Sequence, residues 1–113
     1  MTGTIHHGDC VEWFGTLEAE SVDACVTDPP YGLGTPPPIR MLMKAWLMGQ
    51  DYRPGGGGFM GRKWDAIVPG PRMWSELWRV LKPGAHAVVF AGQRTADLMG
   101  LALRMSGFEI RDL

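Results

Sequence analysis

The fold of this 113-residue chain is decided by residues 22–31, Val22-Asp23-Ala24-Cys25-Val26-Thr27-Asp28-Pro29-Pro30-Tyr31. The first six residues are a compact run of apolar and β-branched side chains, which predicts a strand. Two consecutive prolines cannot continue a hydrogen-bonded ladder, so we expect the strand to stop at Asp28. In open α/β sheets the active residues follow the carboxyl ends of strands, which makes Asp28 a candidate functional residue.

The segment before this strand predicts a short strand and a short helix. Residues 4–7 have the composition of a strand, and Asp9 stands where a helix N-cap is expected, with Glu12 at the capping-box position. One face of this short helix is expected to carry Val11, Phe14 and Leu17.

The segment after the motif, residues 32–70, is rich in glycine and proline. It contains Pro36-Pro37-Pro38 and the run Gly55 to Gly58, which predict a long loop, interrupted by a short helix at 41–48. A loop of this length inside a small domain is usually functional or mobile.

Regular structure is expected again from Pro71 onward. A helix with Trp74, Leu77, Trp78 and Leu81 on its buried face should end at Lys82-Pro83-Gly84. A strand at 87–91, a helix with Leu98, Leu101, Ala102 and Met105 on one face, and a strand at 108–111 should follow. This alternation predicts one α/β domain over residues 1–113, with a sheet covered by helices on both faces.

The charge pattern divides the chain. Residues 1–35 hold six acidic and no basic side chains, whereas residues 36–82 hold eight basic side chains against three acidic ones. The basic part is compatible with a polyanionic partner and equally with ordinary solvated surface. Cys10 and Cys25 are expected to be free thiols, with Cys10 a small buried residue, and the three histidines suggest no metal site. No signal peptide or membrane span is predicted, which favours the cytoplasm.

Three further segments give the Asp-Pro-Pro-Tyr motif its context: Gly8-Asp9-Cys10, Ser21-Val22-Asp23 and the run Arg79 to Gly84. Together they resemble the amino-directed DNA methyltransferases of bacteria and phages, enzymes that use S-adenosylmethionine. Residues 57–65 resemble an insert found in phage members, and the likeness extends through nearly the whole chain. The resemblance implies a partial Rossmann-like class I methyltransferase sheet and DNA as partner, in a restriction-modification, phage-protection or orphan setting.

The resemblance assigns the catalytic role to Asp28, Pro29, Pro30 and Tyr31. The Asp28 carboxylate and the Pro29 carbonyl would accept the two N–H bonds of an exocyclic amine and localise its lone pair. Tyr31 would stack on a base flipped out of the duplex. The structural alternative is a strand end closed by a Pro-Pro turn, with Asp28 satisfying backbone groups and Tyr31 packing.

Asp9 and Cys10 are implied to hold the adenine of S-adenosylmethionine, with Asp28 at the edge of the same cofactor site. The alternative for Asp9 is a helix N-cap alone. DNA phosphates are expected to contact Arg40, Lys44, Arg62 and Lys63, and the alternative is a solvated loop. Gln93, Arg94 and Thr95, which follow the 87–91 strand, are weaker candidates for lining the pocket.

One family feature is missing. The Phe-x-Gly-x-Gly motif, which binds the methionine part of the cofactor, is not found before Leu113. We therefore expect either a fragment of a longer enzyme or a chain that a second polypeptide completes. Adenine is the expected target base. Cytosine-N4, RNA or protein amide methylation and a non-catalytic DNA-binding remnant are the alternatives.

Overall fold

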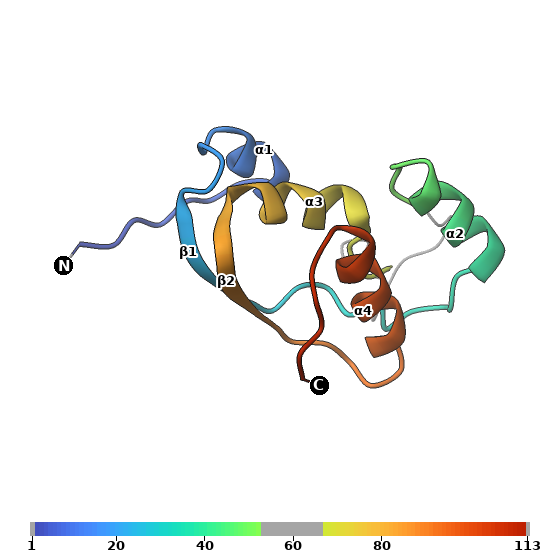
Figure 1. The fold of residues 1–113 in the computed structure, drawn as a ribbon. Helices are drawn as coiled ribbons and strands as arrows, with labels where there is room; N and C mark the ends of the chain where they lie inside the picture. Colours follow the sequence, from blue (N-terminus) through green and yellow to red (C-terminus); the bar gives the residue numbers. More distant parts are fainter. Residues whose placement is uncertain (1, 53–66, 113) are drawn as a thin grey trace.

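The computed structural model describes residues 2–52 and 67–112, and these contain two strands and four helices. The chain order is α1 (Cys10–Gly15), β1 (Val22–Thr27), α2 (Ile39–Leu47), α3 (Pro71–Val80), β2 (Leu81–Val89) and α4 (Ala96–Met105) (Figure 1). The parallel pair of strands flanked by helices confirms the predicted α/β class. The Rossmann-like methyltransferase architecture stays a prediction.

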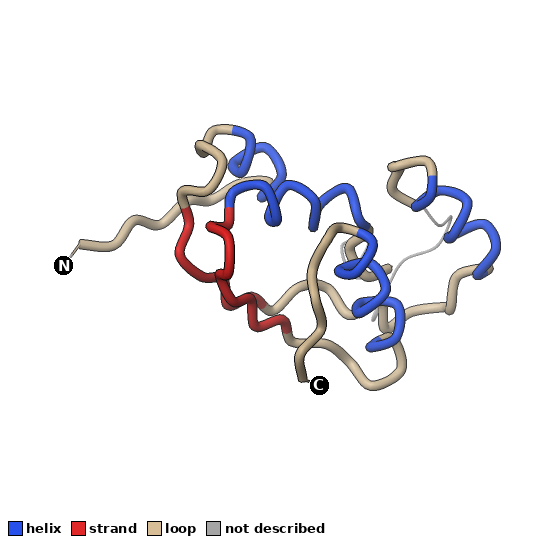
Figure 2. Tube along the Cα trace, in the orientation of Figure 1, coloured by secondary structure: helices blue, strands red, loops and turns tan. Residues whose placement is uncertain are grey.

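The two strands run parallel, with Cys25 opposite Ala87 and Val26 opposite Val88 (Figure 2). The register is irregular near their start, because Val22 pairs with Leu81 whereas Ala24 pairs with His86. The segment Lys82-Pro83-Gly84 lies in this irregularity, where Gly84 adopts a left-handed φ of 79°. These residues were expected to end the preceding helix. The helix instead ends at Val80, and the chain enters β2 directly.

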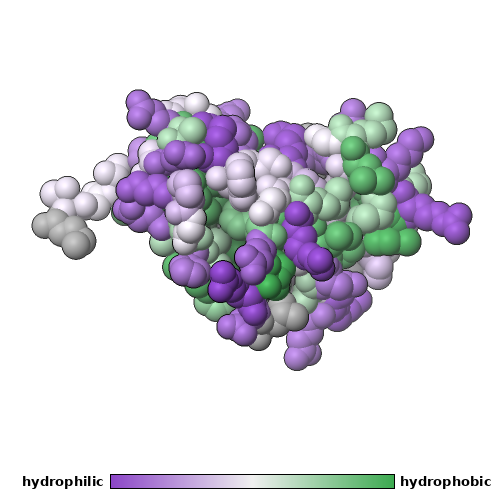
Figure 3. All heavy atoms as spheres, viewed as in Figure 1, coloured by the Kyte–Doolittle hydropathy of each residue, from purple (hydrophilic) through white to green (hydrophobic). Residues whose placement is uncertain are grey.

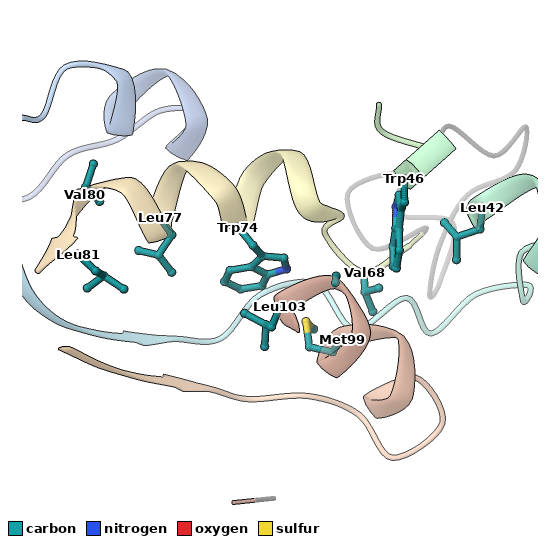
Figure 4. Packing of buried hydrophobic residues seen from close by; sticks show 10 residues of the cluster. Leu42, Trp46, Val68, Trp74, Leu77, Val80, Leu81, Met99 and Leu103 are labelled. Carbon is teal, nitrogen blue, oxygen red and sulfur yellow. The ribbon is translucent and has the colours of Figure 1, made fainter. Parts of the chain in front are cut away.

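The hydrophobic core lies where α3, α4 and the start of β2 meet. Helix α3 begins with Pro71 at its first position, which suits proline because no N–H is needed there. Its buried face carries Trp74, Leu77 and Val80, and α4 contributes Met99, Ala102 and Leu103 (Figure 4). Trp74 was correctly predicted to be a core residue, since only 1% of it is exposed. Helix α2 adds Leu42 and Trp46, which lie near Val68 in the same cluster.

The sheet is open on one face over the described residues. Val26, Val88 and Phe90 are 73%, 52% and 53% exposed, whereas Cys25, Ala87 and Val89 pack against the core. Side chains alternate between the faces of a strand, so the exposed residues share one face. The prediction that helices cover both faces is therefore wrong for residues 2–52 and 67–112.

Two predicted strands are not formed. Residues 4–7 and 108–111 have no regular secondary structure, and Ile5 is 97% exposed. Both are short runs in which the side-chain pattern is compatible with a strand, but neither pairs with β1 or β2. The helix expected at 41–48 is confirmed as α2, shifted by two residues at its start.

Two predicted helix faces are also shifted. Trp78 is 53% exposed and not a core residue, because its indole lies against the backbone of Gly107. In α4, Leu101 and Met105 are more than a third exposed, and Met99 and Leu103 are buried in their place. No helix in the described part of the chain is long and apolar enough to cross a membrane.

Candidate active site

The Asp-Pro-Pro-Tyr motif begins directly after the last residue of β1, as predicted. The backbone N–H of Phe90 donates to the Thr27 carbonyl at 3.0 Å, so the end of β1 is tied to the residue that follows β2. Pro29 is buried and Pro30 is half-buried, whereas Asp28 is exposed. Two prolines restrict φ at this strand end, which gives Asp28 a rigid support.

Asp28 and Tyr31 are hydrogen-bonded to each other. The Tyr31 hydroxyl donates to Asp28 Oδ1, with the two oxygens 2.5 Å apart. This hydrogen bond is the main cause that raises the pKa of Tyr31, followed by burial and by the negative charge of Asp28. The buried Thr95 hydroxyl donates to the backbone carbonyl of Tyr31 from 64 residues further along the chain. Asp28, Tyr31 and Thr95 are therefore joined by a continuous set of contacts.

A cavity of about 430 Å³ lies next to the motif. One wall carries Asp9, Cys10 and Phe14, from α1 and the turn before it. The end of β1 and the motif supply further lining residues, Cys25, Thr27, Pro29 and Pro30. The remaining wall includes Trp46, Tyr52, Val68, Met73 and Trp74. The Asp9 turn and the Pro-Pro segment, separated by 20 residues of sequence, thus line the same space.

The carboxylate of Asp28 and the ring of Tyr31 are not part of this lining. Cys25 and Thr27 of β1 and both prolines of the motif line the cavity, whereas Asp28, which lies between them in the sequence, does not. The structure therefore brings Asp9, Cys10, Pro29 and Pro30 together. Asp28 and Tyr31, the outer residues of the motif, are not among the lining residues.

Asp9 caps α1 as predicted, because its Oδ2 accepts the Glu12 backbone N–H at 3.0 Å. A carboxylate has about four acceptor positions, so this cap leaves capacity for a ligand amine. Cys10 was expected to be buried, but it is exposed at the cavity edge, since it is the first residue of the short helix α1. Partial burial of the sulfur and then the nearby charge of Asp9 raise the pKa of its thiol.

The cations assigned to DNA are only partly described. Arg40 and Lys44 are exposed on α2, one helical turn apart. They share that surface with apolar side chains, which Figure 3 shows gathered over α2, including Ile39, Met41, Leu47 and Met48. Arg62 and Lys63 lie outside the described residues. Gln93 and Arg94 are exposed and are not among the residues that line the cavity.

Sequence reasoning missed Arg79, which holds α1 in place. Its Nη2 donates to the Phe14 carbonyl at 2.7 Å and its Nη1 to the Leu17 carbonyl at 3.1 Å. These contacts span more than 60 residues, so no local pattern indicates them. They fix the helix that Asp9 caps.

No family model matches the chain, and no curated protein or solved structure is detectably similar to it. Among the described residues, no three His, Cys, Asp or Glu side chains gather in a way that could hold a metal ion. Function is therefore inferred from the motif and its geometry alone.

Proposed function

We propose that the chain carries the catalytic site of an S-adenosylmethionine-dependent methyltransferase that acts on the exocyclic amine of adenine in DNA. One observation carries the proposal. Asp28-Pro29-Pro30-Tyr31 stands at the carboxyl end of a parallel strand, beside a cavity that the motif shares with the Asp9-Cys10 turn. Two free thiols and a DNA substrate suit a reducing compartment such as the cytoplasm.

The residues around the cavity fit the adenine part of the cofactor. A volume of about 430 Å³ lies within the range of small-molecule sites. The Asp9 carboxylate is the acceptor that an adenine amino group needs, and the walls beside it are apolar, with Phe14, Cys25 and Pro30. In this proposal Asp9 and Cys10 hold the adenine, and Asp28 stands at the edge of the cofactor cavity, next to its lining residue Pro29. When bound, S-adenosylmethionine supplies an activated methyl group.

The motif residues would prepare the amine. Asp28 accepts one N–H bond and the Pro29 carbonyl the other, which turns the nitrogen lone pair away from the base ring. Methylation leaves the nitrogen with one proton too many, and the exposed Asp28 carboxylate can take this proton and release it to water. Tyr31 offers an aromatic face to the flipped base, and such stacking is worth roughly 1–3 kcal/mol.

A second function is favoured by the position of Asp28. Asp28 is absent from the cavity lining, and its carboxylate accepts the Tyr31 hydroxyl, an arrangement that would also suit a non-catalytic DNA-binding remnant. The open apolar face of the sheet also concerns whether the chain is catalytic by itself, because parallel sheets are usually covered on both faces. A further segment or a second chain is proposed to cover that face and to complete the pocket.

The test is methyl transfer to a defined base. The chain is incubated with S-adenosylmethionine carrying a labelled methyl group and with unmethylated DNA, and the DNA is digested to nucleosides. Labelled N6-methyladenine, lost in Asp28→Ala, supports the proposal, and labelled N4-methylcytosine supports the cytosine alternative. Transfer that is unchanged in Asp28→Ala excludes the mechanism. DNA retention that weakens with salt, without any transfer, supports the remnant.

A further inference from the structure

We infer that Thr95 is a positioning residue: it fixes Tyr31 on one oxygen of the Asp28 carboxylate and leaves the other oxygen to accept the amine. The inference deepens the proposed function and rests on it for the identity of the amine. The contacts among Thr95, Tyr31 and Asp28 do not depend on the proposed function, because they are made within the protein.

The first observation is that the Thr95 hydroxyl does not cap helix α4. Thr95 is the N-cap residue of α4, and the Met99 N–H donates to its carbonyl at 3.0 Å. A threonine in this position normally accepts a helix N–H with its side chain. Here no side-chain cap bond forms, and Asp97 Oδ1 accepts the Leu98 N–H at 2.8 Å. The hydroxyl of Thr95 instead donates to the Tyr31 carbonyl.

The second observation is that the same loop passes close to the Tyr31 side chain at Gly92. A Cβ placed on Gly92 would lie 3.5 Å from both Cβ and Cδ2 of Tyr31, which is ordinary van der Waals contact. The loop between β2 and α4 thus holds the Tyr31 backbone through Thr95 and passes close to the Tyr31 side chain at Gly92, where there is room for no more than a methyl group. Because only 9% of Thr95 is exposed, its hydroxyl has little freedom to choose another acceptor.

The third observation is the bond that transmits this placement to Asp28. The Tyr31 hydroxyl lies 2.5 Å from Asp28 Oδ1. A carboxylate accepts through both oxygens, so Oδ2 stays available when Oδ1 is occupied. A fixed phenol also stops the exposed carboxylate from rotating freely. Holding an acceptor in one orientation before the substrate arrives is what a positioned catalytic group requires.

A spectroscopic test is available because the chain has only two tyrosines, Tyr31 and Tyr52. In a Tyr52→Phe background, ionisation of the single phenol reports Tyr31. The titration is followed by near-ultraviolet absorbance, with circular dichroism recorded at every pH. Should the chain unfold at alkaline pH, the ring-carbon chemical shift of ¹³C-labelled tyrosine at neutral pH reports the same hydrogen bond. Asp28→Asn defines the signal of a Tyr31 without its carboxylate partner.

Two variants separate positioning from simple packing. Thr95→Val keeps the shape and removes the hydroxyl, whereas Thr95→Ser keeps the hydroxyl. Thr95→Val is expected to move the Tyr31 signal toward that of Asp28→Asn, and Thr95→Ser to retain the parent signal. A folded Thr95→Val chain with the parent signal would overturn the inference.

Methyl transfer by the chain with Tyr52 intact provides the second arm. Thr95→Val should lower kcat about tenfold or more, with KM for S-adenosylmethionine unchanged and with recovery in Thr95→Ser. If even the unsubstituted chain transfers no methyl group to DNA, the proposed function fails. The role of Asp28 Oδ2 as the acceptor for the amine then fails as well. The tyrosine signals still decide whether Thr95 positions Tyr31 on Asp28.

Discussion

Arg79 on α3 donates to the carbonyl oxygen of Phe14 on α1, with Nη2 2.7 Å from the oxygen. The same guanidinium reaches the Leu17 carbonyl just beyond the helix. The Phe14 carbonyl also accepts the Leu17 backbone N–H at 3.0 Å, so the guanidinium adds a second, charged donor at the end of α1. Because α1 carries Asp9 at its other end, Arg79 also sets the position of one wall of the cavity.

Removal of this guanidinium should cost stability. We expect Arg79→Met to lower the free energy of unfolding by about 1.5–3 kcal/mol, because hydrogen bonds to a charged donor are lost at a half-buried site. Lys82→Met is the matched control, since Lys82 pairs with Asp23 at 2.6 Å on the exposed surface and should change stability by less than about 1 kcal/mol. Urea unfolding measures both. Equal losses in the two variants would show that Arg79 does not hold α1.

Two glycines should respond to alanine with opposite signs. A Cβ on Gly70 would lie 2.5 Å from Nε1 of Trp46, so Gly70→Ala must displace the indole at a cost of about 1–3 kcal/mol. Gly100 lies inside α4 with open space where a methyl group would stand, and Gly100→Ala should gain up to about 1 kcal/mol of helix stability. Thermal unfolding compares them. A stabilised Gly70→Ala would mean that Trp46 does not pack on Gly70.

The local elements of this fold could be predicted because their signals are local. Asp9 as an N-cap, Pro71 as a helix start and Asp28 at a strand end all follow from the preferences of neighbouring residues. Long-range contacts could not be predicted in the same way. Whether residues 4–7 form a strand depends on a pairing partner, and the exposure of Trp78 depends on where Gly107 passes.

The residues of the candidate site could be predicted from the sequence, whereas the placement of their side chains could not. The motif and the Gly-Asp turn could be singled out from the sequence, and the structure brings both to one cavity. The direction of the Asp28 side chain depends on how β1 alternates between its two faces. The roles of Thr95 and Arg79 depend on contacts across more than 60 residues.

The thiol of Cys10 should report the charge of Asp9. Burial first, and then the Asp9 charge, raise the pKa of this thiol. At a given pH, a smaller fraction of Cys10 is therefore thiolate than of an ordinary cysteine. Asp9→Asn keeps a good N-cap residue and removes the charge, so alkylation of Cys10 near pH 8 should become faster. Burial is the cause that raises the pKa of Cys25, which should react at an unchanged rate. Peptide mapping by mass spectrometry measures both rates. Acceleration at both cysteines would instead indicate loosening of the fold.

The salt dependence of DNA binding should show whether α2 contacts DNA phosphates. Each phosphate contact contributes about 0.9 to the slope of log affinity against log salt, so replacing Arg40 and Lys44 by glutamine should reduce the slope by about 1.8. Arg72→Gln serves as the control, because Arg72 pairs with Asp51 at 3.2 Å. Fluorescence anisotropy of labelled DNA gives the slopes. An unchanged slope in the double variant would remove α2 from the DNA-binding surface.

The central claim is that the Asp28 carboxylate activates the amine, and it is tested most directly by comparing two aspartates of the same chain. The measurement is the initial rate of methyl transfer from saturating S-adenosylmethionine to unmethylated DNA in Asp28→Asn and in Asp23→Asn. Asp23 lies on β1, where it is exposed and pairs with Lys82. We predict a loss of about a hundredfold or more in Asp28→Asn, in line with the removal of one group that stabilises a transition state, and a rate within about twofold of the parent in Asp23→Asn. A parent-like rate in Asp28→Asn would contradict the account.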